Sequence, residues 1–491
     1  MDLQHQSGSF ILKAAWILSM VVVSAQELRS LGSELKNASC DETVQVVGDV
    51  SRGSDGDWWG ERWAGAVAVG TSVYMVPFNS PAVLKIDAVV DTVSLIGRVG
   101  NDPFKWAWAS AIGHMVYCIP LNAAAVLKID ARTDEVTLFG DVGQDPLKWR
   151  NGVVVGPFVF GTPYNADSVL KVDTRTDAIR FVGSFGGGGR KWTGAAAWGQ
   201  KVYFIPHDHA SVLSIDAETE AVKLLGDLGL GSWKYSVVPF ALGPSIYGIP
   251  YHANAVLKID ARTDTIHLLG NLSSAIRSPI NWTIPRSPSR NNSGTGKWAG
   301  DDIVGYSVYA MPYNAASVLK IDSRTDTVSF IGDVGNGGGQ WLGGLSVGPF
   351  VYGIPNDADT VLKIDTRTDA VSFIKEPSHG QWKWAGGVSV GDVVYATPVD
   401  ATTVLRIQSC STSLSTFPTY QTSYYDKLVP LFAGLVVASC LCRNSAKAAK
   451  ASKPGTGIAS TDAANEAELE PIIVGCPAAT RRTSQCSDLQ S

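Results

Sequence analysis

The fold is decided by one stretch of sequence, WLGGLSVGPFVYGIPNDADTVLKIDTRTDAVSFIKEPSHGQWK, at positions 341–383. It contains four short apolar segments, which begin at Gly343, Phe350, Thr360 and Ala370. Each segment is rich in β-branched or aromatic residues, and Gly, Pro, Asn or Asp separates it from the next. Helical periodicity is absent, so the stretch predicts four short antiparallel strands.

The same unit recurs along the chain. Prolines stand at equivalent positions, with spacings of 43, 43, 43, 44, 62, 43 and 43 residues: Pro77, Pro120, Pro163, Pro206, Pro250, Pro312, Pro355 and Pro398. Tryptophans recur with nearly the same period: Trp63, Trp106, Trp149, Trp192, Trp233, Trp298, Trp341 and Trp384. Four strands per unit at this period are typical of β-propeller blades. We therefore predict an all-β, eight-bladed propeller over residues 41–410, with an insertion at 271–297.

The two ends of this region complement each other. Residues 41–50, DETVQVVGDV, copy the fourth strand of a unit without the preceding three, whereas 404–410, VLRIQSC, ends the last unit without a fourth strand. Pairing these segments would close the ring and leave no open sheet edge. Cys40 and Cys410 then occupy the one turn at which the circular pattern is interrupted, so we predict a disulfide between them. The alternative is two unrelated free thiols.

The segment VYGIPNDADTVLKIDTRTDAVSFI, residues 351–374, resembles the YVTN-type β-propeller repeat in its tyrosine strand, its Asn- or Asp-rich turn, its V-x-x-ID strand and its T-[ND]-x-V hairpin. The resemblance extends over about three quarters of the chain and implies a propeller fold. It implies no single activity, because that repeat serves binding surfaces, surface-layer proteins and some enzymes. This chain departs from the repeat in its Ile-Pro pair, its tryptophan and its glycine-rich connection.

Both flanks indicate export. Residues 1–25 read as a signal peptide, with an uncleaved anchor as the alternative. The apolar run at 428–442 is short for a membrane span, but basic residues follow it, so we predict a transmembrane helix with a disordered cytoplasmic tail at 443–491. A helix packed on protein is the alternative. Four glycosylation sequons agree with a plasma-membrane protein whose N-terminal part is extracellular: Asn37, Asn271, Asn281 and Asn291.

Candidate ligand-binding residues lie in the loops between the second and third strands, which carry an Asn, Asp or His at one repeated position: Asn79, Asn122, Asn165, Asp208, His252, Asn314, Asp357 and Asp400. They could bind the hydroxyls of a carbohydrate or a protein partner, or they could simply close turns through their own side chains. The basic residues before the tryptophans are expected on the same face of the ring. Departures from the repeat are the better functional candidates.

One such departure is a group of histidines, His207, His209 and His252, which could bind a metal if the rings converge. We expect no cofactor, since the Cys-x-x-Cys-His haem motif is absent. A formal charge of −5 gives no reason to expect nucleic-acid binding.

Two functions remain open at this point. The first is a non-catalytic ligand- or protein-binding ectodomain of a single-pass surface glycoprotein. The near-identity of the units favours it, because a ring of similar contacts gives little asymmetry for catalysis. The second is an enzyme, such as a lyase, a hydrolase or a quinoprotein-like oxidoreductase, with its site over the central channel.

Overall fold

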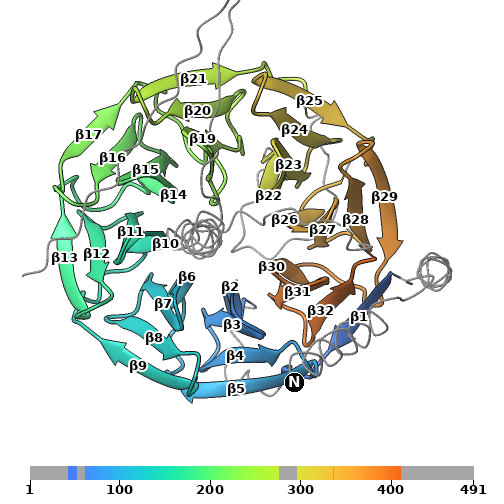
Figure 1. The fold of residues 1–491 in the computed structure, drawn as a ribbon, viewed down its shortest axis with the longest axis horizontal. Helices are drawn as coiled ribbons and strands as arrows, with labels where there is room; N and C mark the ends of the chain where they lie inside the picture. Colours follow the sequence, from blue (N-terminus) through green and yellow to red (C-terminus); the bar gives the residue numbers. More distant parts are fainter. Residues whose placement is uncertain (1–41, 52–60, 276–295, 336, 411–491) are drawn as a thin grey trace, which may run out of the picture. The chain divides into compact units, whose positions relative to one another are not determined.

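The computed structural model of the protein describes residues 42–51, 61–275, 296–335 and 337–410. Within these ranges the chain forms eight four-stranded antiparallel sheets, set as blades around an axis (Figure 1). The predicted eight-bladed propeller is therefore confirmed. We number the blades 1 to 8 in chain order from β2, and each blade's first strand lies innermost and its last strand at the rim (Figure 1).

The strand bounds follow the repeat. Blade 1 consists of β2 Trp63–Val69, β3 Ser72–Pro77, β4 Ala82–Asp87 and β5 Thr92–Arg98, and blade 2 of β6 Trp106–Ile112, β7 Met115–Pro120, β8 Val126–Asp130 and β9 Glu135–Phe139. Blade 3 consists of β10 Trp149–Val155, β11 Phe158–Pro163, β12 Val169–Asp173 and β13 Ala178–Val182, and blade 4 of β14 Trp192–Trp198, β15 Lys201–Pro206, β16 Val212–Asp216 and β17 Val222–Leu225.

Blade 5 consists of β18 Phe240–Leu242, β19 Ser245–Gly248, β20 Val256–Asp260 and β21 Thr265–Leu269, and blade 6 of β22 Trp298–Val304, β23 Ser307–Pro312, β24 Val318–Asp322 and β25 Thr327–Ile331. Blade 7 consists of β26 Trp341–Val347, β27 Phe350–Pro355, β28 Thr360–Asp365 and β29 Ala370–Lys375, and blade 8 of β30 Trp384–Val390, β31 Val393–Pro398, β32 Val404–Gln408 and β1 Thr43–Val47.

Strand β1 closes the ring. It pairs antiparallel with β32, from Thr43 opposite Gln408 to Val47 opposite Val404. The predicted closure of blade 8 by the N-terminal strand is therefore confirmed. Tyr395 and Val404 of blade 8 also pack with Trp63 of blade 1 in one buried cluster, so the last blade is joined to the first by apolar contact as well.

The first strands begin earlier than the sequence indicates. We expected the strand of blade 7 to begin at Gly343, but β26 begins at Trp341 and contains a register shift before Gly344. The shift keeps Trp341 in the sheet, opposite Pro355. The small residues of these strands have the expected cause, because a Cβ on Gly300 would lie 2.4 Å from the Cα of Gly343 in the next blade.

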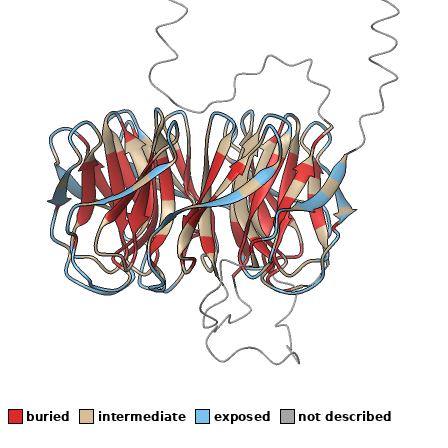
Figure 2. Ribbon diagram, turned by 90° about the horizontal axis from the view of Figure 1, so that it is seen from below, coloured by how far each residue is buried: buried red, intermediate tan, exposed pale blue. Residues whose placement is uncertain are grey.

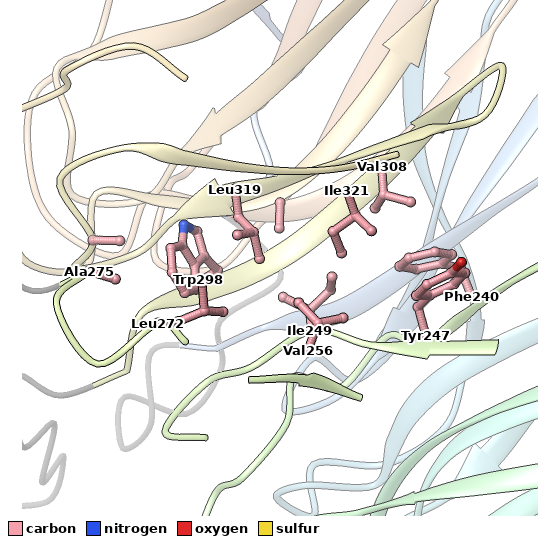
Figure 3. Close-up of a cluster of buried hydrophobic side chains, with 12 residues drawn as sticks. Phe240, Tyr247, Ile249, Val256, Leu272, Ala275, Trp298, Val308, Leu319 and Ile321 are labelled. Atoms are coloured by element: carbon pink, nitrogen blue, oxygen red, sulfur yellow. The ribbon is translucent and has the colours of Figure 1, made fainter. Parts of the chain in front are cut away.

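The apolar core lies between the blades, where Figure 2 shows the buried residues in red. At the contact of blades 5 and 6, Trp298 and Leu319 pack against Leu272 and Val256, while Phe240 stacks on Tyr247 (Figure 3). Burying one aliphatic side chain such as Leu319 contributes about 1.5–3 kcal/mol. Buried clusters of this kind recur between neighbouring blades around the ring.

Several predicted features lie outside the described residues: the signal peptide at 1–25, the apolar run at 428–442, the tail at 443–491, Cys40, and the sequons at Asn37, Asn281 and Asn291. In the part of the chain that the structure describes, no helix is long and apolar enough to cross a membrane. Cys410 is disulfide-bonded, and its pairing with Cys40 stays a prediction. Asn271 is exposed, as an acceptor of a glycan must be.

Candidate functional site

The repeated Asn and Asp residues link neighbouring blades. We call the side of the ring that carries the loops between second and third strands the loop face. There the Oδ1 atom of Asn79 accepts a hydrogen bond of 2.8 Å from the backbone N–H of Phe104, in the loop that enters the next blade. The same bond recurs at six of the predicted positions: Asn79, Asn122, Asn165, Asp208, Asn314 and Asp357.

The other two positions are arranged differently. The Nδ1 atom of His252 lies 3.0 Å from the carbonyl oxygen of Ser232, and the backbone oxygen of Asp400 accepts a bond of 3.1 Å from Arg62. The eight residues are thus distributed around the ring, one to a blade. Their use by a ligand stays a prediction, and their contacts within the protein are explained by blade linkage.

The basic residues of the loop face are also engaged within the protein. Lys148 donates to the carbonyl oxygens of Asn122 and Asp145, at 3.2 and 2.9 Å. Burial lowers the pKa of Lys148 to about 8, and those of Lys105 and Lys297 to about 8 as well. These ammonium groups therefore tie loops together instead of forming a free basic surface.

On the opposite side, the hairpin face, a tyrosine and a lysine of one blade meet an acid of the next. Lys320 lies 2.6 Å from Asp369, which also accepts a hydrogen bond of 3.0 Å from Tyr309. Asp369 has a φ of 59°, a conformation that Asp tolerates better than most residues. Acids at the equivalent position of other blades are Asp91, Asp134, Asp177, Glu220, Asp264, Asp326 and Glu42.

Trp233 is not a member of the repeated tryptophan series, which corrects our assignment. Tyr235 takes that position, because it follows Lys234 and forms a bridge with Pro250, as Trp106 pairs with Pro120. The other seven tryptophans are buried, and their indole N–H groups each donate to a backbone oxygen of their own blade. Trp233 instead lies half-buried in the entry loop, with a φ of 57°.

Around Trp233, side chains from three blades form a group that we call the Arg150 cluster: Arg150, Tyr164, His207, Trp233 and Tyr251. The guanidinium carbon of Arg150 lies 5.3 Å from the ring centre of Tyr164 and 5.5 Å from that of Trp233. The ring of His207 lies 5.2 and 4.5 Å from the same two rings. This is a departure from the repeat with an aromatic frame and a cation at its centre.

His207 is 1% exposed, and its Nδ1 atom lies 2.5 Å from Oδ1 of Asp208. Its Nε2 atom is buried and has no hydrogen-bond partner among the described residues. Burial, and then the charge of Arg150, lower the pKa of His207 to about 4, so the ring is neutral at pH 7. With the proton on Nδ1 facing Asp208, Nε2 carries a lone pair that can accept a hydrogen bond.

The three predicted metal ligands do not form a metal-binding group. Nδ1 of His209 accepts from the backbone of Ser211, and its ring packs 4.5 Å from Trp192, whereas His207 is held by Asp208. Over the described ranges, no group of three or more His, Cys, Asp or Glu side chains is arranged to hold a metal ion. The three rings belong to two blades, and local turn contacts orient them separately.

Sequence reasoning missed Asp301 and Asp302 on the innermost strand β22. Other blades carry small or apolar residues there, such as Gly344 in β26. Oδ2 of Asp302 accepts the backbone N–H of Ser346 at 2.5 Å, whereas Oδ1 of Asp301 is buried without a hydrogen bond in the described structure. Burial raises the pKa of Asp301 well above its usual value. A comparison of the first strands, blade by blade, would have found this pair.

No family model matches the chain, and no curated protein matches it in sequence. The YVTN resemblance thus rests on the repeat pattern alone. Among solved structures, the computationally designed Ika8 protein is similar with a TM-score of 0.53 at 10% identity, covering 72% of this chain and 98% of the designed one. Virginiamycin B lyase from Staphylococcus aureus gives a TM-score of 0.47 at 8% identity, covering 75% of this chain and 100% of the lyase. At 10% identity, the likeness to Ika8 is one of fold alone.

Proposed function

We propose that the ring is a non-catalytic binding module, and that the Arg150 cluster makes its main ligand contacts. The repeated polar groups of both faces are used to join blades, as Asn79 and Asp369 illustrate. The Arg150 cluster is different, because it breaks the repeat and concentrates aromatic rings at one part of the loop face. Half-buried aromatic residues supply contact area for little loss of conformational entropy. This gathering of rings is the observation that supports the proposal.

Binding of the full chain to glycan and protein arrays tests this function. Trp233→Ala is expected to abolish or strongly weaken binding to whatever ligand the wild type retains. Trp198→Ala is the matched control, because Trp198 is a 37% exposed tryptophan at the far end of β14, toward the hairpin face. Equal binding by both variants and the wild type would refute the role of the cluster.

We also propose that this module is the extracellular part of a single-pass plasma-membrane glycoprotein. The support is the sequence of the flanks, the exposed sequon at Asn271 and the cysteine at each end of the ring. Labelling of intact cells with a membrane-impermeant reagent is expected to modify the lysines of the ring and to spare those of residues 443–491. Labelling of the tail without the ring would contradict this topology.

A second candidate function, an enzyme with its site at the axis, is favoured by the pair Asp301 and Asp302. Burial raises the pKa of Asp301, and carboxylic acids with raised pKa values gather at catalytic sites, where they can act as general acids. An enzyme of this kind would turn over a small molecule in a substrate panel, and Asp301→Asn would abolish that turnover while Trp233→Ala would not. Turnover unchanged in Asp301→Asn would exclude a role for this acid.

A further inference from the structure

Arg150 differs from four arginines of the hairpin face in having no carboxylate partner among the described residues. The hairpin arginines Arg132, Arg175, Arg324 and Arg367 each lie 2.6–3.0 Å from an aspartate two residues before them. The guanidinium of Arg150 has no ion pair and no hydrogen bond to any described residue, although the residue is half-buried and its guanidinium carbon lies over the rings of Tyr164 and Trp233. The guanidinium packs on two aromatic rings, and its N–H groups have no acceptor among the described residues. The planar edge of a guanidinium matches a carboxylate, which it can bind through two parallel hydrogen bonds.

The surroundings of Arg150 favour an anion. Burial first, and then the charge of Arg150, lower the pKa of His207, while Asp208 raises it, so Arg150 and Asp208 are the two charges that act most strongly at this point of the loop face. Asp208 lies beside His207, but its Oδ1 atom already accepts from the imidazole and from the backbone N–H of Trp233, at 2.5 and 3.0 Å. The carboxylate of Asp208 therefore orients the cluster and is not the partner of Arg150.

His207 offers a hydrogen-bond acceptor, which a ligand would have to match with a hydrogen-bond donor. Its buried Nε2 atom accepts no hydrogen bond from the described residues, and the ring shares both aromatic neighbours with Arg150. A buried acceptor without a partner costs about 1–3 kcal/mol, which a ligand hydroxyl could recover. The half-buried rings of Trp233 and Tyr251, 5.8 Å apart, continue the surface with apolar faces. The acidic sugars combine all three features, a carboxylate, hydroxyls and a flat apolar face.

We infer that the Arg150 cluster binds a sugar acid of the uronic type, with its carboxylate on Arg150, a hydroxyl on Nε2 of His207 and its ring against Trp233. This inference rests on the proposed binding function and adds the ligand class to it. Neutral sugars would keep the stacking and the hydroxyl contact but would lose the charge-assisted pair. Free phosphate would meet Arg150 but would find no use for the aromatic faces.

The test is a titration of the full chain with galacturonic acid, methyl galactoside and inorganic phosphate. Binding is monitored by tryptophan fluorescence and ligand-observed NMR. The uronate is expected to bind at least about ten-fold more tightly than the neutral sugar, as the loss of a hydrogen bond to a charged group implies. Arg150→Gln is expected to reduce uronate affinity to the level of the neutral sugar and to leave the neutral sugar unaffected. Arg150→Lys, which keeps the charge but not the planar edge, should fall between the two.

Arg175→Gln is the matched control, because Arg175 also lies over a ring, 5.5 Å from the centre of Phe158, but is paired with Asp173 on the hairpin face. It is expected to leave all affinities unchanged. Uronate affinity equal to that of methyl galactoside, or unchanged in Arg150→Gln, would overturn the inference. If Trp233→Ala still abolished binding of the neutral sugar or of an array ligand, the proposed binding function would stand even though the sugar-acid assignment had failed. Tighter binding of phosphate than of uronate would likewise overturn the sugar-acid assignment.

Discussion

Replacing Glu42 by glutamine tests how the ring is held closed. Glu42 immediately precedes β1. Its Oε2 atom accepts a hydrogen bond of 2.9 Å from Lys363 of blade 7, and its Oε1 atom accepts one from the hydroxyl of Tyr352. The side chains of Lys363 and Glu42 are 17% and 18% exposed, so water screens the pair only in part. The Nζ atom of Lys363 further lies 3.9 Å from the ring centre of Phe350.

The expected loss lies between two limits. An exposed ion pair contributes about 0–1 kcal/mol, and removing one partner of a fully buried pair costs about 3–5 kcal/mol. Glutamine preserves an acceptor for Tyr352 but leaves the ammonium of Lys363 without its counter-charge, so we expect a loss of about 2 kcal/mol in the free energy of unfolding. With an unfolding entropy of about 2 cal/mol/K per residue, the melting temperature of a domain of this length should fall by about 2–3 °C.

Thermal unfolding of the full chain, monitored by tryptophan fluorescence, measures this shift in melting temperature. Arg132→Gln is the control, since the side chain of Arg132 is 65% exposed and pairs with Asp130 inside its own hairpin. The control should change the free energy of unfolding by less than about 0.5 kcal/mol. If Glu42→Gln shifted the melting temperature no more than Arg132→Gln, the closing ion pair would contribute nothing beyond a surface contact, and the reasoning would be refuted.

Four further outcomes are expected. Burial lowers the pKa of Lys148 to about 8, so above pH 8 the unfolded chain binds more protons than the folded chain. The urea concentration at the midpoint of unfolding should therefore rise between pH 8 and pH 10. Lys148→Met should reduce this rise, and an equal rise in the variant would contradict the reasoning. The pKa of His207 is lowered to about 4, so stability should fall as the pH falls from about 6.5 to 4, and less so in His207→Gln. Non-reducing peptide mapping should recover Cys40 and Cys410 in one linked peptide, whereas separate peptides would exclude the pairing. Enzymatic deglycosylation of the full chain produced in glycosylating cells should convert Asn271 to aspartate, detectable by mass spectrometry, and an unmodified Asn271 would show that this sequon carries no glycan.

The fold could be predicted because its information is periodic. Strands, turns and the repeat length are local patterns, and the unpaired copy at 41–50 needed only a partner at the other end of the region, which β32 provides. The start of β26 was missed by two residues, because the register shift that keeps Trp341 in the sheet has no local signature.

The site was harder to predict because its contacts join different blades. Turn chemistry suggested that Asn79 closes its own loop, but its partner, Phe104, lies 25 residues away in the next unit. Trp233 was assigned to the repeat from its spacing alone, although alignment on Lys234 would have separated it. The contact of Arg150 with Trp233 joins blade 3 to blade 5, and no pattern within one unit indicates such a neighbour.

Pairing of β1 with β32 has a consequence for synthesis of the chain. The segment Thr43–Val47 leaves the ribosome early, yet its partner Val404–Gln408 is among the last parts of the ring to be made. At roughly 5–20 residues per second, translation of the intervening chain takes roughly 20–70 s. Throughout that interval the strand has no partner to pair with, so we expect nascent chains to associate through this strand less often when a chaperone covers it.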